Sequence, residues 1–182
     1  MNKSISMILA IVFIAALCIT MTAEEKKVPA NCTLANGQVT VNNPLANWQF
    51  NKYAGENQCT LEKQDSPENP LYLSPRIDVV YSTRKQIQVS AEAWAQDHAE
   101  HTIDALNPKV TDAKLGGKAV KKLTYKKVEK TFDKKESFDV LYQEYFVVEK
   151  DYALNITVVC LKTEVEAVGK QADEILAKIQ LK

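Results

Sequence analysis

Two histidines are the residues of this sequence best suited to acid–base or metal chemistry. They are His98 and His101, and no other histidine is present. If this segment is helical, Asp97, His101 and Asp104 lie on one face at spacings of four and three. An imidazole beside two carboxylates can bind a transition metal. The competing interpretation is an ordinary solvated helix surface, because the spacing matches no zinc signature and acids are common there.

The other ingredients of catalysis are not arranged in any recognisable pattern. The sequence shows no Ser–His–acid or Cys–His pattern and no glycine-rich phosphate loop. Paired carboxylates alone do not identify an enzyme, since their separation in space is not visible in a sequence. We therefore expect a non-enzymatic protein that carries no cofactor.

Lysines are concentrated between residues 109 and 135. Ten lysines and three acids give this segment a charge of +7, in a chain whose formal net charge is zero. Such asymmetry steers binding toward an acidic protein or an anionic envelope surface, and nucleic acid is not expected because aromatic residues do not interleave with the lysines. An alternative stays open, because lysines on an edge strand also prevent pairing between sheets. The expected binding residues are Lys118, Lys121, Lys122, Lys126, Lys127 and Lys130.

The N-terminus predicts export. Residues 1–23 give a positive start, an apolar run and a small-residue stretch that ends at Ala23, the order of a secretory signal. Retention of this run as a membrane anchor is the alternative, and a lipid anchor on Cys18 is disfavoured because Leu17 precedes it. Cleavage after Ala23 would leave a net charge of −1, a polar leader over 24–36 and a single domain over 37–182 without a transmembrane helix. We expect a periplasmic or secreted protein.

Three cysteines follow the predicted cleavage point, so one disulfide and one free thiol are expected in an oxidising compartment. Three pairings are possible. We favour Cys32–Cys59, because Cys160 follows Leu154, Ile156 and Val158 on one face of a predicted strand and is expected to be buried.

The elements that must position these residues form an α+β pattern. A hydrophobic content of 46% and a charged content of 25% are typical of a globular domain. A helix is predicted over 90–106, capped by Ser90, and a second over 164–179 with a capping box of Thr163 and Glu166. A change of side-chain parity near 126–127 predicts a bulge. Strands are predicted over 38–41, 48–50, 59–62, 76–82, 119–132, 138–148 and 152–161. Strands grouped between helices favour a mostly antiparallel sheet with a helix on each side.

Three sequence features carry a resemblance to a known family. They are 39–41 followed by Pro44 and Trp48, then 116–119 before the long strands, and 175–177 in the last helix. With the order of elements, they resemble the PsbP-like and DcrB-like α/β/α sandwich proteins. The resemblance implies an exported binding or assembly module and supplies no catalytic residues to carry over.

Our preferred hypothesis is therefore an exported, non-enzymatic module that binds an envelope partner through a lysine-rich hairpin. The first alternative is a metal protein or enzyme built on the helix 90–106. The second is a carrier of a small ligand between helix and sheet, near Trp94 and Tyr142.

Overall fold

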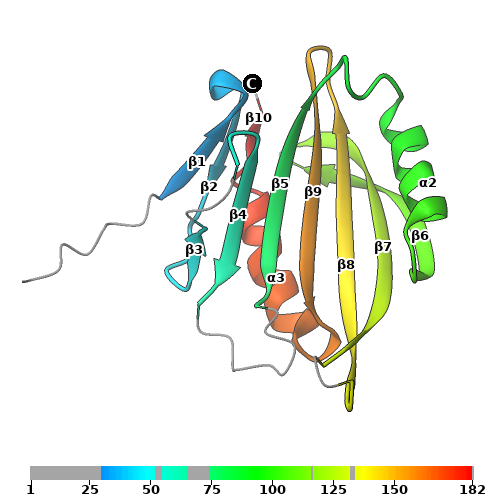
Figure 1. Ribbon diagram of the computed structural model, residues 1–182. Helices are drawn as coiled ribbons and strands as arrows, with labels where there is room; N and C mark the ends of the chain where they lie inside the picture. The colour runs from blue at the N-terminus through cyan, green and yellow to red at the C-terminus, as the bar shows by residue number, and fades with distance from the viewer. Residues whose placement is uncertain (1–29, 52–54, 65–73, 116, 132–133, 182) are drawn as a thin grey trace, which may run out of the picture.

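The protein is an antiparallel α+β sandwich (Figure 1). The computed structural model describes residues 30–51, 55–64, 74–115, 117–131 and 134–181. The predicted signal and the first residues of the predicted leader lie outside this range. Every strand pair in the described residues is antiparallel, and two α-helices pack against the strands, so the predicted fold class is confirmed.

The larger sheet has seven strands in the order β3-β4-β5-β9-β8-β7-β6. The predicted strand 138–148 lies in its interior and carries buried side chains on both faces, as expected. The bounds are β3 (Trp48–Phe50), β4 (Gln58–Lys63), β5 (Arg76–Thr83), β6 (Leu106–Leu115), β7 (Lys118–Lys130), β8 (Ser137–Val148) and β9 (Tyr152–Leu161).

A second, three-stranded sheet closes the N-terminal side of the molecule. It consists of β1 (Asn31–Leu34), β2 (Val39–Asn42) and β10 (Gln180–Leu181), in the order β1-β2-β10. The structure differs here from the predicted leader: its second half forms β1 and the 3-10 helix η1 (Ala35–Gly37). Backbone pairing with β2 orders this segment, and the four-residue strand has too little alternation to be recognised in the sequence.

The first helix, α2 (Ala91–His101), begins as predicted and ends early. Its N-cap Ser90 accepts a hydrogen bond from the backbone N–H of Ala93, at 3.2 Å. The predicted extension to residue 106 is wrong, because the chain turns at Thr102 and Leu106 already begins β6. Pairing of β6 with β7 supplies the backbone hydrogen bonds that a longer helix would have supplied.

The last helix, α3 (Val165–Leu176), follows the 3-10 helix η2 (Lys162–Glu164). Its predicted apolar stripe is confirmed, since Val168, Ala172, Ile175 and Leu176 are buried. The predicted capping box is wrong: the N-cap residue is Glu164, and no side chain caps the helix. The preceding 3-10 turn displaces the helix start past Thr163.

The two helices cover opposite faces of the larger sheet. Trp94 and Ala95 of α2 pack on Leu123, Phe146 and Ala153. The apolar stripe of α3 packs against the alternate residues of β9 in the main core: Leu154, Ile156, Val158 and Cys160. Figure 1 shows α3 behind the sheet and α2 beside β6 and β7. Each face thus has its own helix, and side chains of every central strand alternate between the two cores.

The bulge predicted in β7 is absent there, and an irregularity lies instead in the neighbouring strand β6. The β7–β8 ladder runs without interruption from Lys121 to Lys130, so the expected bulge at 126–127 is wrong. The irregularity is in β6, where Leu106 pairs with Lys126 and Lys109 with Thr124. The parity change read from the sequence has another cause: Val128 is 47% exposed and does not belong to the core.

Candidate binding surface

Strand alternation divides the predicted lysine cluster between two faces of the sheet. We call the face that packs on α2 the α2 face, and β7 contributes Lys121 and Lys127 to it. The opposite face, which we call the lysine face, carries the even-numbered lysines of β7 and Lys109 of β6. Its members are Lys109, Lys118, Lys122, Lys126 and Lys130. The six predicted binding residues therefore do not form one surface.

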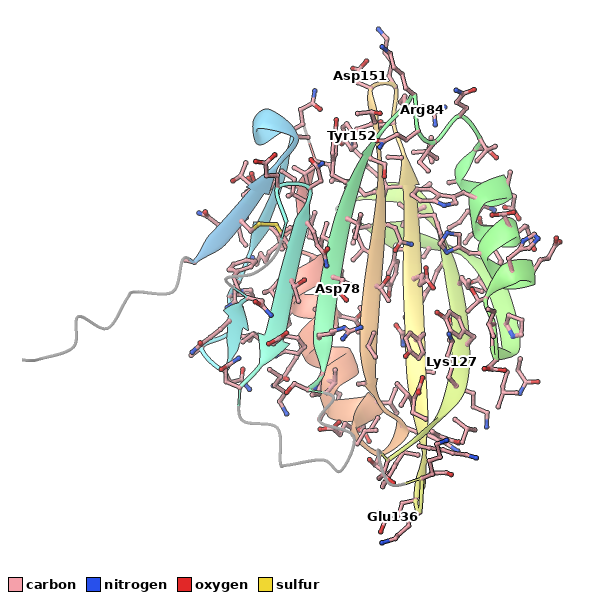
Figure 2. The ribbon with its side chains drawn as sticks, in the orientation of Figure 1. Asp78, Arg84, Lys127, Glu136, Asp151 and Tyr152 are labelled. Atoms are coloured by element: carbon pink, nitrogen blue, oxygen red, sulfur yellow. A yellow bond between two sulfur atoms is a disulfide. The ribbon has the colours of Figure 1, made fainter. Side chains whose placement is uncertain are left out.

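The two lysines that β7 contributes to the α2 face are engaged by neighbouring side chains. Lys121 forms ion pairs with Glu92 and with Asp112, the latter at 2.7 Å between Nζ and Oδ1. Hydrogen bonds to these two carboxylates raise the pKa of Lys121, with Asp112 the larger cause. Lys127 Nζ lies 5.8 Å and 5.6 Å from the ring centroids of Tyr125 and Tyr142, a cation–π arrangement. Figure 2 shows Lys127 beside the lower half of β7.

The lysines of the lysine face have fewer acidic partners. Lys118 Nζ lies 2.6 Å from Glu149 Oε1. Lys126 shares Asp139 with Lys162 of η2, each at 3.4 Å, and hydrogen bonds from Lys126 and Lys162 lower the pKa of Asp139. Among the described residues, Glu149 and Asp139 are the carboxylates that form ion pairs with lysines of this face.

Three lysines of this face remain without a carboxylate at ion-pairing distance among the described residues. Lys122 Nζ lies 5.0 Å from the ring centroid of Tyr145. Lys109 and Lys130 are exposed. Counting Lys162, six ammonium groups thus share two paired carboxylates, so this face has an excess of positive charge that the α2 face lacks.

The metal face considered as an alternative, Asp97 with His101 and Asp104, is not formed in the described structure. His101 Nδ1 lies 3.2 Å from Asp97 Oδ1, as helical spacing of four allows. Asp104, however, lies beyond the end of α2 in a turn with a φ of 59°. No group of three metal-ligating side chains occurs among the residues described. These three residues do not share a helix face because α2 ends at His101, before Asp104.

A buried carboxylate on the α2 face was missed by the sequence analysis. Glu144 is 5% exposed, and its Oε1 accepts a hydrogen bond from the Tyr125 hydroxyl at 2.8 Å. Its Oε2 accepts from Asn155 Nδ2 at 3.0 Å and lies 3.2 Å from His98 Nδ1. His98 Nε2 accepts a hydrogen bond from Trp94 Nε1 at 3.1 Å, so the Nδ1 that faces Glu144 is the donor. The signal was a glutamate inside an apolar strand.

This network joins α2 to three strands of the sheet. Burial alone would raise the pKa of Glu144, but hydrogen bonds from His98, Tyr125 and Asn155 outweigh it and hold that pKa below the ordinary value. Burial, followed by the hydrogen bond to Glu144, raises the pKa of Tyr125. Both carboxylate oxygens already have donors, so the geometry is that of a structural attachment of the helix.

Aromatic rings fill the region between helix and sheet where a carried ligand was considered. Trp94 packs edge-on against Phe146 with ring centroids 5.1 Å apart, and Tyr142 stacks on Tyr125 at 4.9 Å.

A cleft of about 850 Å³ lies elsewhere in the molecule and is lined by residues from both sheets. Its lining includes Thr33, Gln38, Glu56, Asn57, Tyr81 and Asp151. Glu56, Asn57, Tyr81 and Asp151 belong to the larger sheet or its turns, and all six side chains end in a polar group.

The cysteines are arranged as predicted. A disulfide joins Cys32 of β1 to Cys59 of β4, with 6.1 Å between the Cα atoms, and so connects the two sheets. Cys160 is free and buried, and burial raises the pKa of its thiol to about 11. Its buried thiol is unsuited to nucleophilic chemistry.

Comparison with solved structures places the chain in a class by fold. LpqN, a protein involved in cell envelope biogenesis of Mycobacterium tuberculosis, matches with a TM-score of 0.56 and 13% identity, over 79% of this chain and 82% of that one. A protein of Bacteroides thetaiotaomicron VPI-5482 matches with a TM-score of 0.54 and 10% identity, over 84% of this chain. The match covers 48% of that second protein, so this chain spans about half of its length.

These similarities concern the fold alone, because the identities are low. A mutant form of Mog1 also matches, with a TM-score of 0.48 and 14% identity over 83% of this chain and 94% of that one. No protein-family profile and no curated protein sequence matches this chain. What the described residues show is the predicted fold class, an α+β arrangement in which helices cover both faces of an antiparallel sheet.

Proposed function

We propose that this protein is an exported, non-enzymatic module that binds an anionic partner of the cell envelope through the lysine face. The observation that carries the proposal is the charge on that face, where its five lysines and the neighbouring Lys162 of η2 share two paired carboxylates. An unbalanced cluster of this kind attracts anionic surfaces and increases the rate of encounter with them. The two lysines that β7 contributes to the α2 face, Lys121 and Lys127, contribute less, because both are engaged within the fold.

Export is supported by two independent features. The N-terminal sequence has the order of a secretory signal. The disulfide Cys32–Cys59 is typical of proteins that fold in an oxidising compartment. LpqN, which shares the fold, is involved in cell envelope biogenesis. We place the function of this chain in the same compartment, and note that no helix in the described part of the chain is long and apolar enough to span a membrane.

A non-enzymatic role agrees with the chemistry of the buried groups. The carboxylate of Glu144 is occupied by three hydrogen-bond partners, and His98 is held between Glu144 and Trp94. A general acid or base must instead reach the proton that it transfers on a substrate. The proposal therefore assigns these groups to stability and assigns binding to the lysines.

The test is retention on an anionic support by variants with equal charge changes on different surfaces. The first variant is Lys109→Glu, Lys122→Glu and Lys130→Glu on the lysine face. Its matched control is Lys85→Glu, Lys114→Glu and Lys150→Glu, three exposed lysines away from that face. Both change the net charge equally, so a difference between them reports the position of the charge.

We expect wild type and the control to be retained on a polyglutamate resin at low salt and released as salt rises. The lysine-face variant should be released at a distinctly lower salt concentration. Equal elution of the two variants would refute the role of the lysine face. Circular dichroism and melting temperatures of all three proteins establish that each is folded.

A further inference from the structure

Two exposed apolar side chains, Leu106 and Val128, lie together at one corner of the lysine face, and a third, Ile103, lies in the loop that leads into it. Leu106 is opposite Lys126 in the β6–β7 ladder, and Val128 is the next residue of β7 on that face. Ile103 lies three residues before Leu106 in the loop from α2. Ile103, Leu106 and Val128 are 79%, 41% and 47% exposed, and we call these three residues the apolar corner. The other strongly exposed large apolar residue among those described, Val89, precedes α2 at its opposite end.

The backbone holds this corner in an unusual conformation. Asp104 and Asn107, on either side of Leu106, have φ angles of 59° and 53°. Asp and Asn tolerate this left-handed region better than other non-glycine residues. The extra residue in β6 then pairs Leu106 and Lys109 with Lys126 and Thr124, which both belong to the lysine face. In a regular strand, residues three apart point to opposite faces, so the bulge brings Leu106 and Lys109 to the same side.

The chemistry around the corner is that of lysine and aliphatic side chains. Lys109, Lys126 and Lys130 lie on the same face, and the nearby acids are Asp104 and Asp139. Protein-binding interfaces are enriched in arginine and aromatic residues and depleted in lysine. The described arginines lie elsewhere: Arg76 pairs within the ladder on the α2 face, and Arg84 lies at the opposite end of the sheet from Lys127 (Figure 2).

We infer that the lysine face and the apolar corner together bind the surface of an anionic lipid bilayer. The ammonium groups contact lipid phosphates, and the apolar corner enters the boundary between headgroups and acyl chains. Lysines near a membrane surface and a few aliphatic side chains give this combined electrostatic and hydrophobic attachment. The inference rests on the proposed function, since it names the partner of the same face. A soluble anionic polymer offers no apolar region for the apolar corner to enter, and the lysine-rich composition is unlike that of protein-binding interfaces.

Co-sedimentation with vesicles tests this directly. The assay uses protein that begins at Glu24, so that the predicted signal cannot itself insert into lipid. All described helices and strands lie after residue 29 and are therefore kept. The vesicles are phosphatidylcholine alone or phosphatidylcholine with one quarter phosphatidylglycerol. Polyglutamate resin is the lipid-free anionic comparison. The apolar-corner variant is Ile103→Ser, Leu106→Thr and Val128→Thr. Its control is Val89→Thr, which changes an apolar side chain outside the corner that is as exposed as Val128.

We expect wild type and Val89→Thr to bind the anionic vesicles and not the neutral ones. The apolar-corner variant should lose at least about tenfold in vesicle partitioning while its retention on polyglutamate is unchanged, because the variant keeps every lysine. The lysine-face variant should lose both its vesicle binding and its retention on polyglutamate.

If the apolar-corner variant binds vesicles as strongly as wild type, the lipid inference is overturned and the proposed function stays intact. The same follows if wild type is retained on polyglutamate and binds neither vesicle. If the lysine-face variant is retained on polyglutamate as strongly as wild type, the proposed function itself is refuted.

Discussion

The two faces of β7 carry similar side chains in very different surroundings. On the α2 face, Lys121 is paired with Asp112 and Glu92, and Lys127 lies over two tyrosine rings. On the lysine face, Lys109 and Lys130 are exposed, and Asp139 serves two lysines at once. The lysines that β7 contributes to the α2 face are held by neighbouring side chains, whereas several lysines of the lysine face are exposed to solvent.

The difference shows that a cluster in sequence is not a cluster in space. Successive residues of a strand point to opposite faces, so a run of lysines is separated by the strand itself. What then decides the surroundings of each lysine is which side chains lie beside it on its own face. Here α2 brings Glu92 over one side, while α3 packs mainly against β9 and leaves the outer part of the lysine face open.

Removal of the ring that attaches α2 to the sheet should have the largest effect. Trp94 is 9% exposed and packs on Phe146, so Trp94→Ala should lower the free energy of unfolding by about 3–5 kcal/mol. Urea denaturation measures this. The matched substitution at the other surface, Ile103→Ser, should change stability by no more than about 0.5 kcal/mol. Similar losses for the two variants would contradict the division between a structural and an open face.

Removal of the buried carboxylate should have the next largest effect. Glu144→Ala leaves the donors of Tyr125, Asn155 and His98 without their acceptor, and should cost about 2–3 kcal/mol of stability. Glu144→Gln keeps the shape and one acceptor, so its loss should be smaller. If alanine is tolerated as well as glutamine in urea denaturation, the network does not hold α2 in place.

The same carboxylate predicts a pH dependence. The pKa of Glu144 is lower in the fold than its ordinary value of 4.5. Ionised Glu144 therefore stabilises the fold fully above about pH 4.5, and this contribution is lost as pH falls through the lowered pKa. Unfolding free energies of wild type measured between pH 6 and pH 3 should decline more steeply than those of Glu144→Gln. Parallel curves would mean that another acid dominates.

Charge removal on the lysine face should have the smallest effect on stability. Lys109→Gln with Lys130→Gln removes two exposed ammonium groups, and the free energy of unfolding should stay within about 0.5 kcal/mol of wild type. Retention on polyglutamate should nevertheless fall. A large loss of stability would show that these two lysines stabilise the fold, which would contradict their assignment to an open binding surface.

Much of the fold could be predicted because strong periodicity marks it. The alternation of 152–161 and the apolar stripe of α3 gave the main core, and buried Cys160 left Cys32 and Cys59 as the disulfide. Weak periodicity explains the misses. Most side chains of β6 are exposed, so the sequence shows no clear alternation there and 102–106 is predicted as the end of a helix. The same error puts Asp104 on one helix face with His101, whereas it lies in a turn.

The candidate site was predictable in composition and not in arrangement. The excess of lysine over 109–135 is visible in the sequence, and it remains the basis of the proposed function. The expected bulge at 126–127 concealed the division of β7 into two faces, because a bulge there would have changed the side of every later lysine. The position of the real bulge depends on the partner strand β6, which local patterning does not report.

The sequence by itself determined the strands with clear alternation, the antiparallel α+β class and the pairing of Cys32 with Cys59. These follow from local periodicity and from the chemistry of single residues. Only the tertiary structure decided which lysines are paired, where Glu144 finds its donors and that Leu106 lies beside Lys126. Such contacts join residues far apart in the chain, so they depend on which elements pack together.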